Sequence, residues 1–96
     1  TVNNDALTAQ MLPTVKRVAG EVNVAPGPKL TGAEDFSFYL QKVPGVFYFV
    51  GITPPGSDMS KIGYNHSPKF FIDETGLQLG VRLLANLTVD FMQSKQ

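Results

Sequence analysis

The 96-residue chain has no cysteine and only one histidine. The absence of cysteine excludes disulfides, thiolate nucleophiles and zinc sites built on thiolates. It is compatible with a reducing compartment, and we expect a cytoplasmic protein. No apolar run approaches the roughly 20 residues that a membrane-spanning helix needs, so we expect no membrane association.

An excess of charge of one sign is also missing. Eight basic and eight acidic residues give a formal net charge of zero, and no run of lysine or arginine could follow a phosphate backbone. We therefore expect no nucleic-acid partner. The hydrophobic fraction of 43% is sufficient for the core of one small globular domain.

Three helices are predicted from apolar periodicity and capping residues. The first starts after Asn3 and Asn4 and ends at Gly20, with a kink or break at Pro13. The second follows a capping box formed by Thr31 and Glu34. The third is capped by Asp73, and we expect its apolar stripe to lie against a sheet. The stripe comprises Leu77, Val81, Leu84, Thr88 and Phe91 together with Gly80 and Leu87, and Arg82, Asn86, Asp90 and Gln93 lie opposite.

Two strands are predicted between these helices. Residues 21–25 alternate polar and apolar side chains, which is typical of an edge strand, and residues 46–51 form a continuous β-branched and aromatic run, typical of a central strand. The order helix, strand, helix, strand, helix indicates an α/β fold. Because two strands leave a sheet without neighbours, we expect residues 1–96 to be the end of a larger domain.

The histidine, His66, lies in the polar stretch 63–70, near the end of a connection longer than the usual length of about 4 to 6 residues. Histidine is well suited to bind a transition metal or to transfer protons near neutral pH. Pro68 restricts Ser67 to extended conformations and so limits the backbone beside the imidazole. The alternative interpretation is a rigid turn that happens to contain a histidine.

Other polar residues make weaker candidates for catalysis. Glu34 and Asp35 are adjacent in a predicted helix, so their side chains point in different directions and we favour helix capping over an acid pair. Ser67 has no base partner other than His66, and the chain has no Gly-x-Ser-x-Gly motif. A serine hydrolase is therefore not expected.

Three segments in one order resemble a known family. They are Thr-Gly-Ala-Glu-Asp-Phe-Ser at 31–37, Pro-Gly-Val-Phe-Tyr-Phe-Val-Gly at 44–51 and Asn-His-Ser-Pro-Lys-Phe at 65–70. Together they resemble the C-terminal part of the M20 metallopeptidases. The first and third segments look most like the amidohydrolase branch, which includes hippurate hydrolase, N-acyl-amino-acid amidohydrolases and auxin-conjugate hydrolases.

This resemblance implies a catalytic domain of α/β/α type, interrupted by a smaller lid domain that often dimerises. Residues 1–96 would be the C-terminal segment of the catalytic domain after the lid, without the N-terminal half or the lid itself. His66 would be one ligand of a centre of two divalent ions (zinc, manganese, nickel or cobalt). Glu34, Asp35 and Ser67 would lie near that centre and orient its groups or hold the surrounding structure.

The resemblance also implies that the glutamate general base and the other metal ligands lie in upstream motifs, so no catalytic residue is assigned within 1–96. A zinc site needs about three protein ligands, and we expect the isolated chain to be inactive and to bind no metal. The longer protein would hydrolyse the amide bond of N-acyl amino acids or peptides and form a homodimer through its lid. The alternative hypothesis is a self-sufficient, non-catalytic α/β binding or assembly module.

Overall fold

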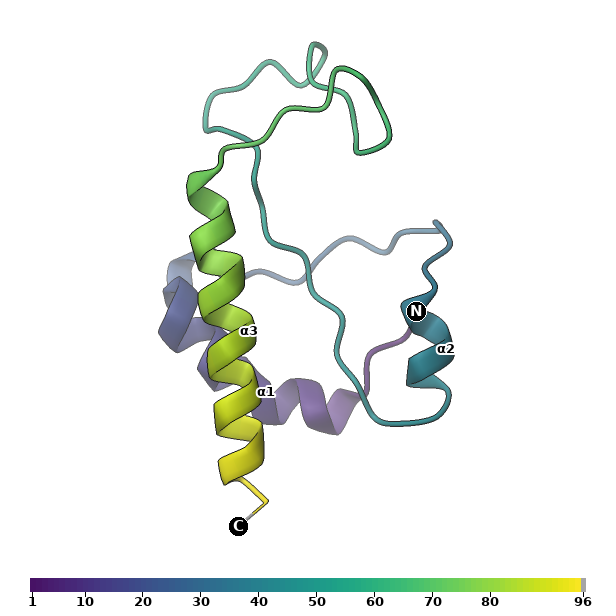
Figure 1. Cartoon of the computed structure of the whole chain (residues 1–96), viewed down its shortest axis with the longest axis vertical. Coiled ribbons are helices and arrows are strands. Elements are labelled where there is room, and N and C mark those ends of the chain that lie inside the picture. Colours follow the sequence, from purple (N-terminus) through teal and green to yellow (C-terminus); the bar gives the residue numbers. More distant parts are fainter. Residues whose placement is uncertain (96) are drawn as a thin grey trace.

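A computed structural model of the chain describes residues 1–95, and most of its regular structure is helical (Figure 1). Gln96, the last residue of the expected 1–96 segment, lies outside the described residues. Within 1–95 the only β pairing is an isolated bridge between Gly63 and Phe70, so the predicted helix–strand order is not observed. The elements in chain order are α1 (Asp5–Ala19), the 3-10 helix η1 (Glu21–Asn23), α2 (Phe36–Leu40) and α3 (Thr75–Gln93).

Helix α1 confirms the prediction for the N-terminal segment. The Asn4 Oδ1 accepts a hydrogen bond of 2.9 Å from the Leu7 N–H, and Gly20 ends the helix with a φ of 85°. Such a left-handed φ favours glycine. The predicted break at Pro13 is not observed, because α1 continues through this residue. Met11 and Thr14, on either side of Pro13, are both buried and anchor the helix across the missing N–H.

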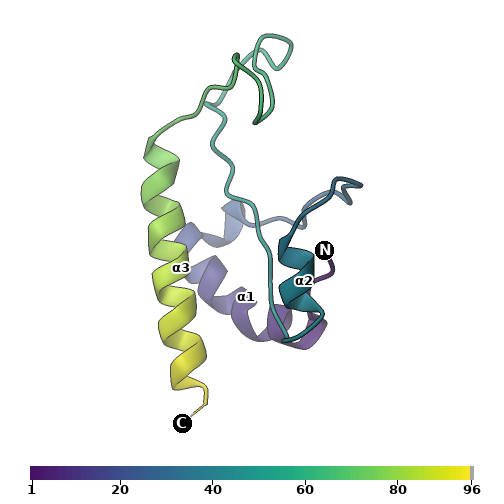
Figure 2. The same ribbon diagram turned by 45° about the vertical axis from the view of Figure 1, so that its right-hand side comes forward.

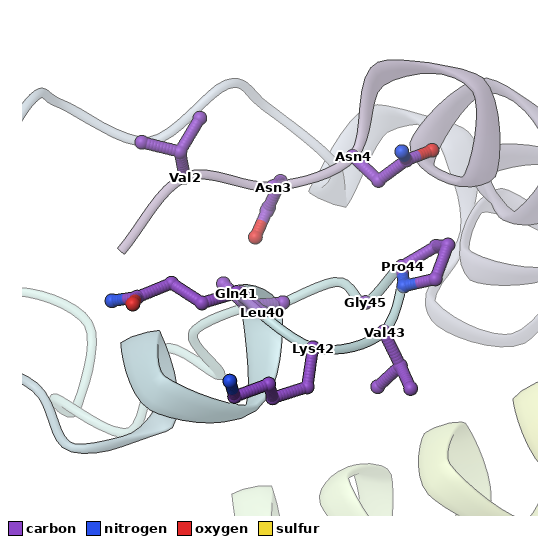
Figure 3. Close-up of a pocket in the computed structure, with 9 residues that line it drawn as sticks. All are labelled: Val2, Asn3, Asn4, Leu40, Gln41, Lys42, Val43, Pro44 and Gly45. Carbon is purple, nitrogen blue, oxygen red and sulfur yellow. The ribbon is translucent and has the colours of Figure 1, made fainter.

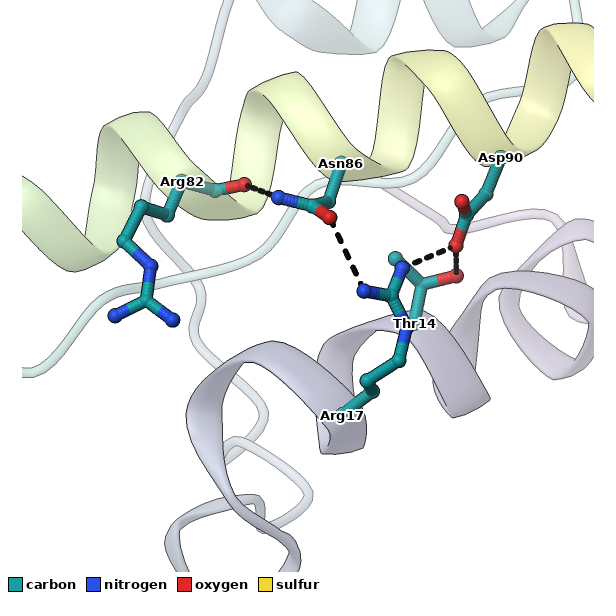
Figure 4. A network of polar contacts seen from close by, with 5 residues as sticks. All are labelled: Thr14, Arg17, Arg82, Asn86 and Asp90. Carbon is teal, nitrogen blue, oxygen red and sulfur yellow. Dashed lines mark hydrogen bonds and ion pairs between the residues drawn. The ribbon is translucent and has the colours of Figure 1, made fainter.

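The core lies where α3 crosses α1, as both views show (Figures 1 and 2). Leu83 of α3 is the most buried side chain in the described part of the chain, with 4% of its surface exposed. A polar network also joins the two helices (Figure 4). Asp90 Oδ2 accepts hydrogen bonds from the Thr14 hydroxyl at 2.5 Å and from the Arg17 guanidinium at 2.7 Å. Arg17 also donates to Asn86 Oδ1 at 3.1 Å.

The face of α3 that meets α1 is not the predicted apolar stripe. Asn86 and Asp90, which lie opposite the stripe, contact α1, whereas Leu84 of the stripe is 62% exposed. The physical reason is that α1 presents Thr14 and Arg17, whose donors match the polar face of α3. No sheet within residues 1–95 covers the stripe.

The two predicted strands also differ from the structure. Residues 21–23 form η1, in which the Asn23 N–H donates to Gly20 O at 3.0 Å, and Lys16 pairs with Glu21 at 2.9 Å. These local interactions stabilise the turn, so it does not need a neighbouring strand. Residues 46–51 run as an extended segment between α2 and α3 (Figures 1 and 2). The segment is not a strand here, because no other strand in the described part of the chain pairs with it.

The capping box predicted at Thr31 is absent from the described structure. Helix α2 begins at Phe36, and the Glu34 Oε1 accepts a hydrogen bond of 3.2 Å from the Phe36 N–H. The ring of Phe36 lies 5.6 Å from that of Phe47, measured between centroids. Thus α2 contributes an aromatic face against the extended segment. No helix within residues 1–95 has the length and apolar character needed to cross a membrane.

The Asp90 network predicts an acid-sensitive stability. Hydrogen bonds from Thr14 and then Arg17 hold the pKa of Asp90 below its ordinary value of 3.8. A carboxylate with a lowered pKa in the folded state stabilises the protein above its unfolded pKa, and this contribution is lost as the pH falls through the folded pKa. The Asp90→Asn variant should therefore melt below the wild type at pH 7, and the difference in melting temperature should narrow from pH 4 downward.

Thermal melts by circular dichroism between pH 7 and pH 2 measure this difference. Glu21→Gln is the matched control, because Glu21 also has a lowered pKa through its pair with Lys16 but is far more exposed, at 76% of its side chain against 30% for Asp90. Exposed ion pairs contribute little to stability. A constant difference between wild type and Asp90→Asn at all pH values would contradict the prediction.

Candidate functional site

The segment 63–70 forms a closed loop at the end of the molecule away from α1. The Gly63 N–H donates to Lys69 O at 3.1 Å, and the Ser67 N–H donates to Tyr64 O at 3.1 Å. The bridge between Gly63 and Phe70 closes the loop. His66 is therefore carried on a turn whose two ends are held together.

His66 has a φ of 74° and is the only residue other than glycine with a positive φ within the described chain. Non-glycine residues rarely adopt this left-handed conformation, and such strained positions concentrate at functional sites. The side chain is exposed, and its Nε2 lies 3.4 Å from the Asn65 Nδ2. The imidazole thus projects from the loop and is accessible from outside.

Ser67 shapes the loop. A Cβ atom placed on Gly63 would overlap the Ser67 Oγ and lie 2.6 Å from its Cβ, so this close approach requires glycine. The Ser67 Oγ also accepts a hydrogen bond of 3.2 Å from the Lys69 N–H. The hydroxyl is therefore used in holding the backbone that follows His66.

The loop is attached to α3 through Asp73, which caps the helix as predicted. The Asp73 N–H donates to Ile52 O at 2.7 Å, and its Oδ1 accepts from the Thr75 hydroxyl at 2.6 Å and from the Thr75 N–H at 3.0 Å. The Thr75 hydroxyl and then its N–H lower the pKa of Asp73. Both ends of the long connection are thus held at the start of α3.

Glu34 and Asp35 are not brought to His66 in this structure. They immediately precede α2, and both views show that segment apart from the loop region that precedes α3 (Figures 1 and 2). No hydrogen bond or ion pair joins the two regions within residues 1–95. The described residues also contain no group of three His, Asp or Glu side chains that could hold a metal ion. His66 alone supplies one ligand where a catalytic zinc typically needs three.

A shallow pocket of about 390 Å³ lies elsewhere, between the N-terminal residues and the turn after α2 (Figure 3). Its wall includes Asn3, which sequence reasoning treated only as a helix-capping residue. The Asn3 carboxamide bonds both polar groups of one peptide residue: its Oδ1 accepts from the Phe47 N–H at 2.7 Å, and its Nδ2 donates to Phe47 O at 2.8 Å. The pair of adjacent asparagines gave no signal that distinguished this role.

Comparison with known proteins finds similarity across nearly the whole chain. The model of Peptidase family M20/M25/M40 matches residues 1–90. IAA-amino acid hydrolase ILR1-like 6 of Arabidopsis thaliana is 33% identical over 95 residues, which cover 99% of this chain and 20% of that protein. No solved structure gives a significant match.

Two microbial proteins are similar to the same extent. The putative amidohydrolase YhaA of Bacillus subtilis is 34% identical over 92 residues, covering 96% of this chain and 23% of the relative. Thermostable carboxypeptidase 2 of Saccharolobus solfataricus is 37% identical over 91 residues, covering 95% of this chain and 22% of the relative. The chain thus spans about a fifth of the length of the curated relatives that it matches.

Proposed function

This chain belongs to Peptidase family M20/M25/M40, and from this we propose that it is the C-terminal segment of the catalytic domain of a metal-dependent amidohydrolase. The relatives named as an IAA-amino acid hydrolase, an amidohydrolase and a carboxypeptidase support hydrolysis of an amide bond. The substrate class that we propose is N-acyl amino acids or related small peptides. The proposal includes a homodimer through the lid domain and a cytoplasmic location, with which the absence of cysteine is compatible.

In this proposal His66 is a metal ligand, and the observation that supports it is the conformation of its loop. A strained left-handed residue presents an exposed imidazole, while the Gly63 and Ser67 contacts hold the backbone on both sides of it. The chemistry of one neutral imidazole fits a single coordination position of a divalent ion such as zinc, manganese, nickel or cobalt. It does not fit a complete centre, so the other ligands must come from outside residues 1–96.

When bound, a pair of divalent ions would polarise the amide carbonyl and lower the pKa of a water molecule. The contribution of this chain would be to keep the His66 ring at a fixed position and to exclude alternative loop conformations. No residue of this chain is proposed to transfer the proton, and a glutamate outside it would do so. We propose that Glu34, Asp35 and Ser67 support the surroundings of the site; only Ser67 contacts the His66 loop in the described structure.

The extended segment 46–51 would then be a strand of the α/β/α sheet of the longer protein. Its β-branched and aromatic residues and the exposed apolar stripe of α3 both support this proposal, because each needs a covering partner to become buried. The small number of buried residues also favours a segment of a larger domain over a self-sufficient module. Within 1–95 only Met11, Thr14 and Leu83 are buried.

The direct test is to replace His66 in the longer enzyme and to measure turnover and metal content together. Unchanged turnover and unchanged metal content would refute the assignment. Both measurements are needed, because a loss of turnover alone could follow from a displaced substrate.

The isolated chain provides a separate prediction. We expect it to hydrolyse no N-acetyl amino acid and to bind zinc no more tightly than its His66→Asn variant, because a single imidazole cannot retain the ion. Isothermal titration of the metal-free chain with zinc chloride at pH 7 measures the affinity. One-to-one binding that disappears in the variant would show that the chain contains a metal site of its own, and it would favour the self-sufficient module.

A further inference from the structure

The long connection that carries His66 is closed at its base by contacts between its two ends. The Asp73 N–H donates to Ile52 O at 2.7 Å, and Gly76, in the first turn of α3, lies against the Ile52 side chain. These three residues, which we call the loop base, are all half-buried. Both views show the chain leaving and returning at the start of α3 (Figures 1 and 2). His66 is therefore carried on a loop whose two ends meet at one place.

The fit at the loop base requires a glycine at position 76. A Cβ atom placed on Gly76 would lie 2.9 Å from the Ile52 Cγ2 and 3.6 Å from Gly51 O. Carbon atoms in ordinary contact lie about 3.5–4.0 Å apart, so a side chain here would push the two ends apart by roughly 0.5–1 Å. The methyl group of Ile52 cannot easily turn away, because a β-branched side chain is restricted in χ1. Even the smallest side chain at this position thus displaces one end of the loop.

The loop base is also close along the chain to His66. Only two residues separate Asp73 from Phe70, at which the β bridge closes the His66 loop. Three residue steps span at most about 10 Å, even when the chain is fully extended. The Phe70 N–H donates to Ser67 O at 3.0 Å, directly beside His66. A shift at the loop base therefore reaches the imidazole through a short length of chain that is held at both ends.

We propose that the loop base positions His66 for metal binding, with Gly76 as the residue that allows the two ends to meet. This inference rests on the proposed function, because it requires His66 to be a metal ligand. The loop base directly follows the segment 46–51, the proposed strand, and ligands of open α/β sheets bind beyond the carboxyl ends of the strands. Gly76 and Ile52 contact neither the metal nor the substrate in this proposal, and they act through the loop.

The zinc affinity of the longer M20 enzyme tests this role without relying on turnover. The metal-free enzyme is titrated with zinc chloride in competition with a chelator. We expect Gly76→Ala to raise the dissociation constant for zinc by about 10- to 100-fold, the usual cost of disturbing groups that orient a metal ligand. Ile52→Ala removes the obstructing Cγ2, so the double variant Ile52→Ala/Gly76→Ala should bind zinc within about twofold of Ile52→Ala alone. A glycine needed only for folding would lower the melting temperature of the metal-free enzyme and leave the zinc affinity unchanged.

A disulfide across the loop base provides a second variant, which does not depend on the folding of Gly76→Ala. The Cβ atom placed on Gly76 lies 3.7 Å from the Ile52 Cβ, a spacing that suits a disulfide. In Ile52→Cys/Gly76→Cys, oxidised glutathione accepts the two electrons and two protons that the thiols lose. Mass spectrometry of the peptides that contain both positions verifies the bond. We expect the oxidised variant to bind zinc as tightly as the wild type, because the closed loop base is the metal-binding conformation.

The variant His66→Asn separates this inference from the proposed function. If it loses zinc while Gly76→Ala keeps the wild-type affinity, His66 is a ligand that the loop base does not position, and the inference is overturned. Weaker zinc binding by the oxidised disulfide variant, or no recovery of affinity in Ile52→Ala/Gly76→Ala, would also overturn it. If His66→Asn itself binds zinc like the wild type, the proposed function fails, and this inference fails with it.

Discussion

Replacing His66 with asparagine in an M20 enzyme that contains this segment is expected to lower kcat/KM by at least about 100-fold and to reduce the bound metal. Removing groups that only orient a metal ligand already costs about 10- to 100-fold in activity or affinity, so loss of the ligand itself should cost more. Steady-state kinetics and elemental analysis of the purified enzyme measure the two effects. The result follows from His66 being a ligand, which is our proposal.

Asparagine is chosen so that the loss of a metal ligand can be distinguished from a change in the conformation of the loop. His66 has a φ of 74°, and asparagine tolerates this left-handed conformation better than most residues. His66→Gly is the companion variant, because glycine adopts such a φ without strain. If His66 serves only as a turn residue, both variants should retain activity and metal, and the glycine variant should be the more stable of the two. Loss of metal in both variants, with an unchanged melting temperature, supports ligation.

Local signals in the sequence were sufficient for the elements whose hydrogen bonds are local. The Asn4 cap, the end of α1 at Gly20 and the Asp73 cap of α3 are all made by residues within four positions of their partners. Such interactions depend little on the rest of the protein. They were therefore predictable from a short window of residues.

The elements that were predicted wrongly depend on contacts with residues that are distant in the sequence. Residues 46–51 have strand composition, but a strand requires a second strand, and here Asn3 offers only a side chain to Phe47. The face of α3 that meets α1 is decided by the bonds of Arg17 and Asp90, which are 73 positions apart. Apolar periodicity predicted a stripe on α3, but it could not identify which face of the helix this chain covers.

Likewise, the sequence singled out His66 but gave no indication of its backbone conformation. The left-handed φ arises from the closed loop, in which Gly63 must approach Ser67 closely. Glu34 and Asp35 were grouped with His66 by the resemblance, yet nothing in the described structure joins them. In our proposal the site is assembled from several parts of a longer protein, so the contacts of residues 1–95 alone cannot reconstruct it.

The Leu83→Ala substitution in the isolated chain is expected to lower the free energy of unfolding by about 2–5 kcal/mol, the usual cost of truncating a buried leucine. Leu83 is 4% exposed and belongs to α3, which packs on α1 and is joined to it by the bonds of Asp90 to Thr14 and Arg17. A small domain has little stability in excess, so this loss should remove most of the cooperative unfolding transition. Urea titrations followed by circular dichroism measure the change.

The neighbouring residue provides the control, because Leu84 has the same side chain but is 62% exposed on the predicted stripe. In the isolated chain Leu84→Ala should change the free energy of unfolding by less than about 0.5 kcal/mol, as is usual for surface substitutions. Equal losses in the two variants would contradict the packing of α3 described above. In the longer enzyme, where we propose that a sheet covers the stripe, Leu84→Ala should become costly as well. The contrast between the two contexts therefore tests whether the exposed face of α3 is buried by the rest of the protein.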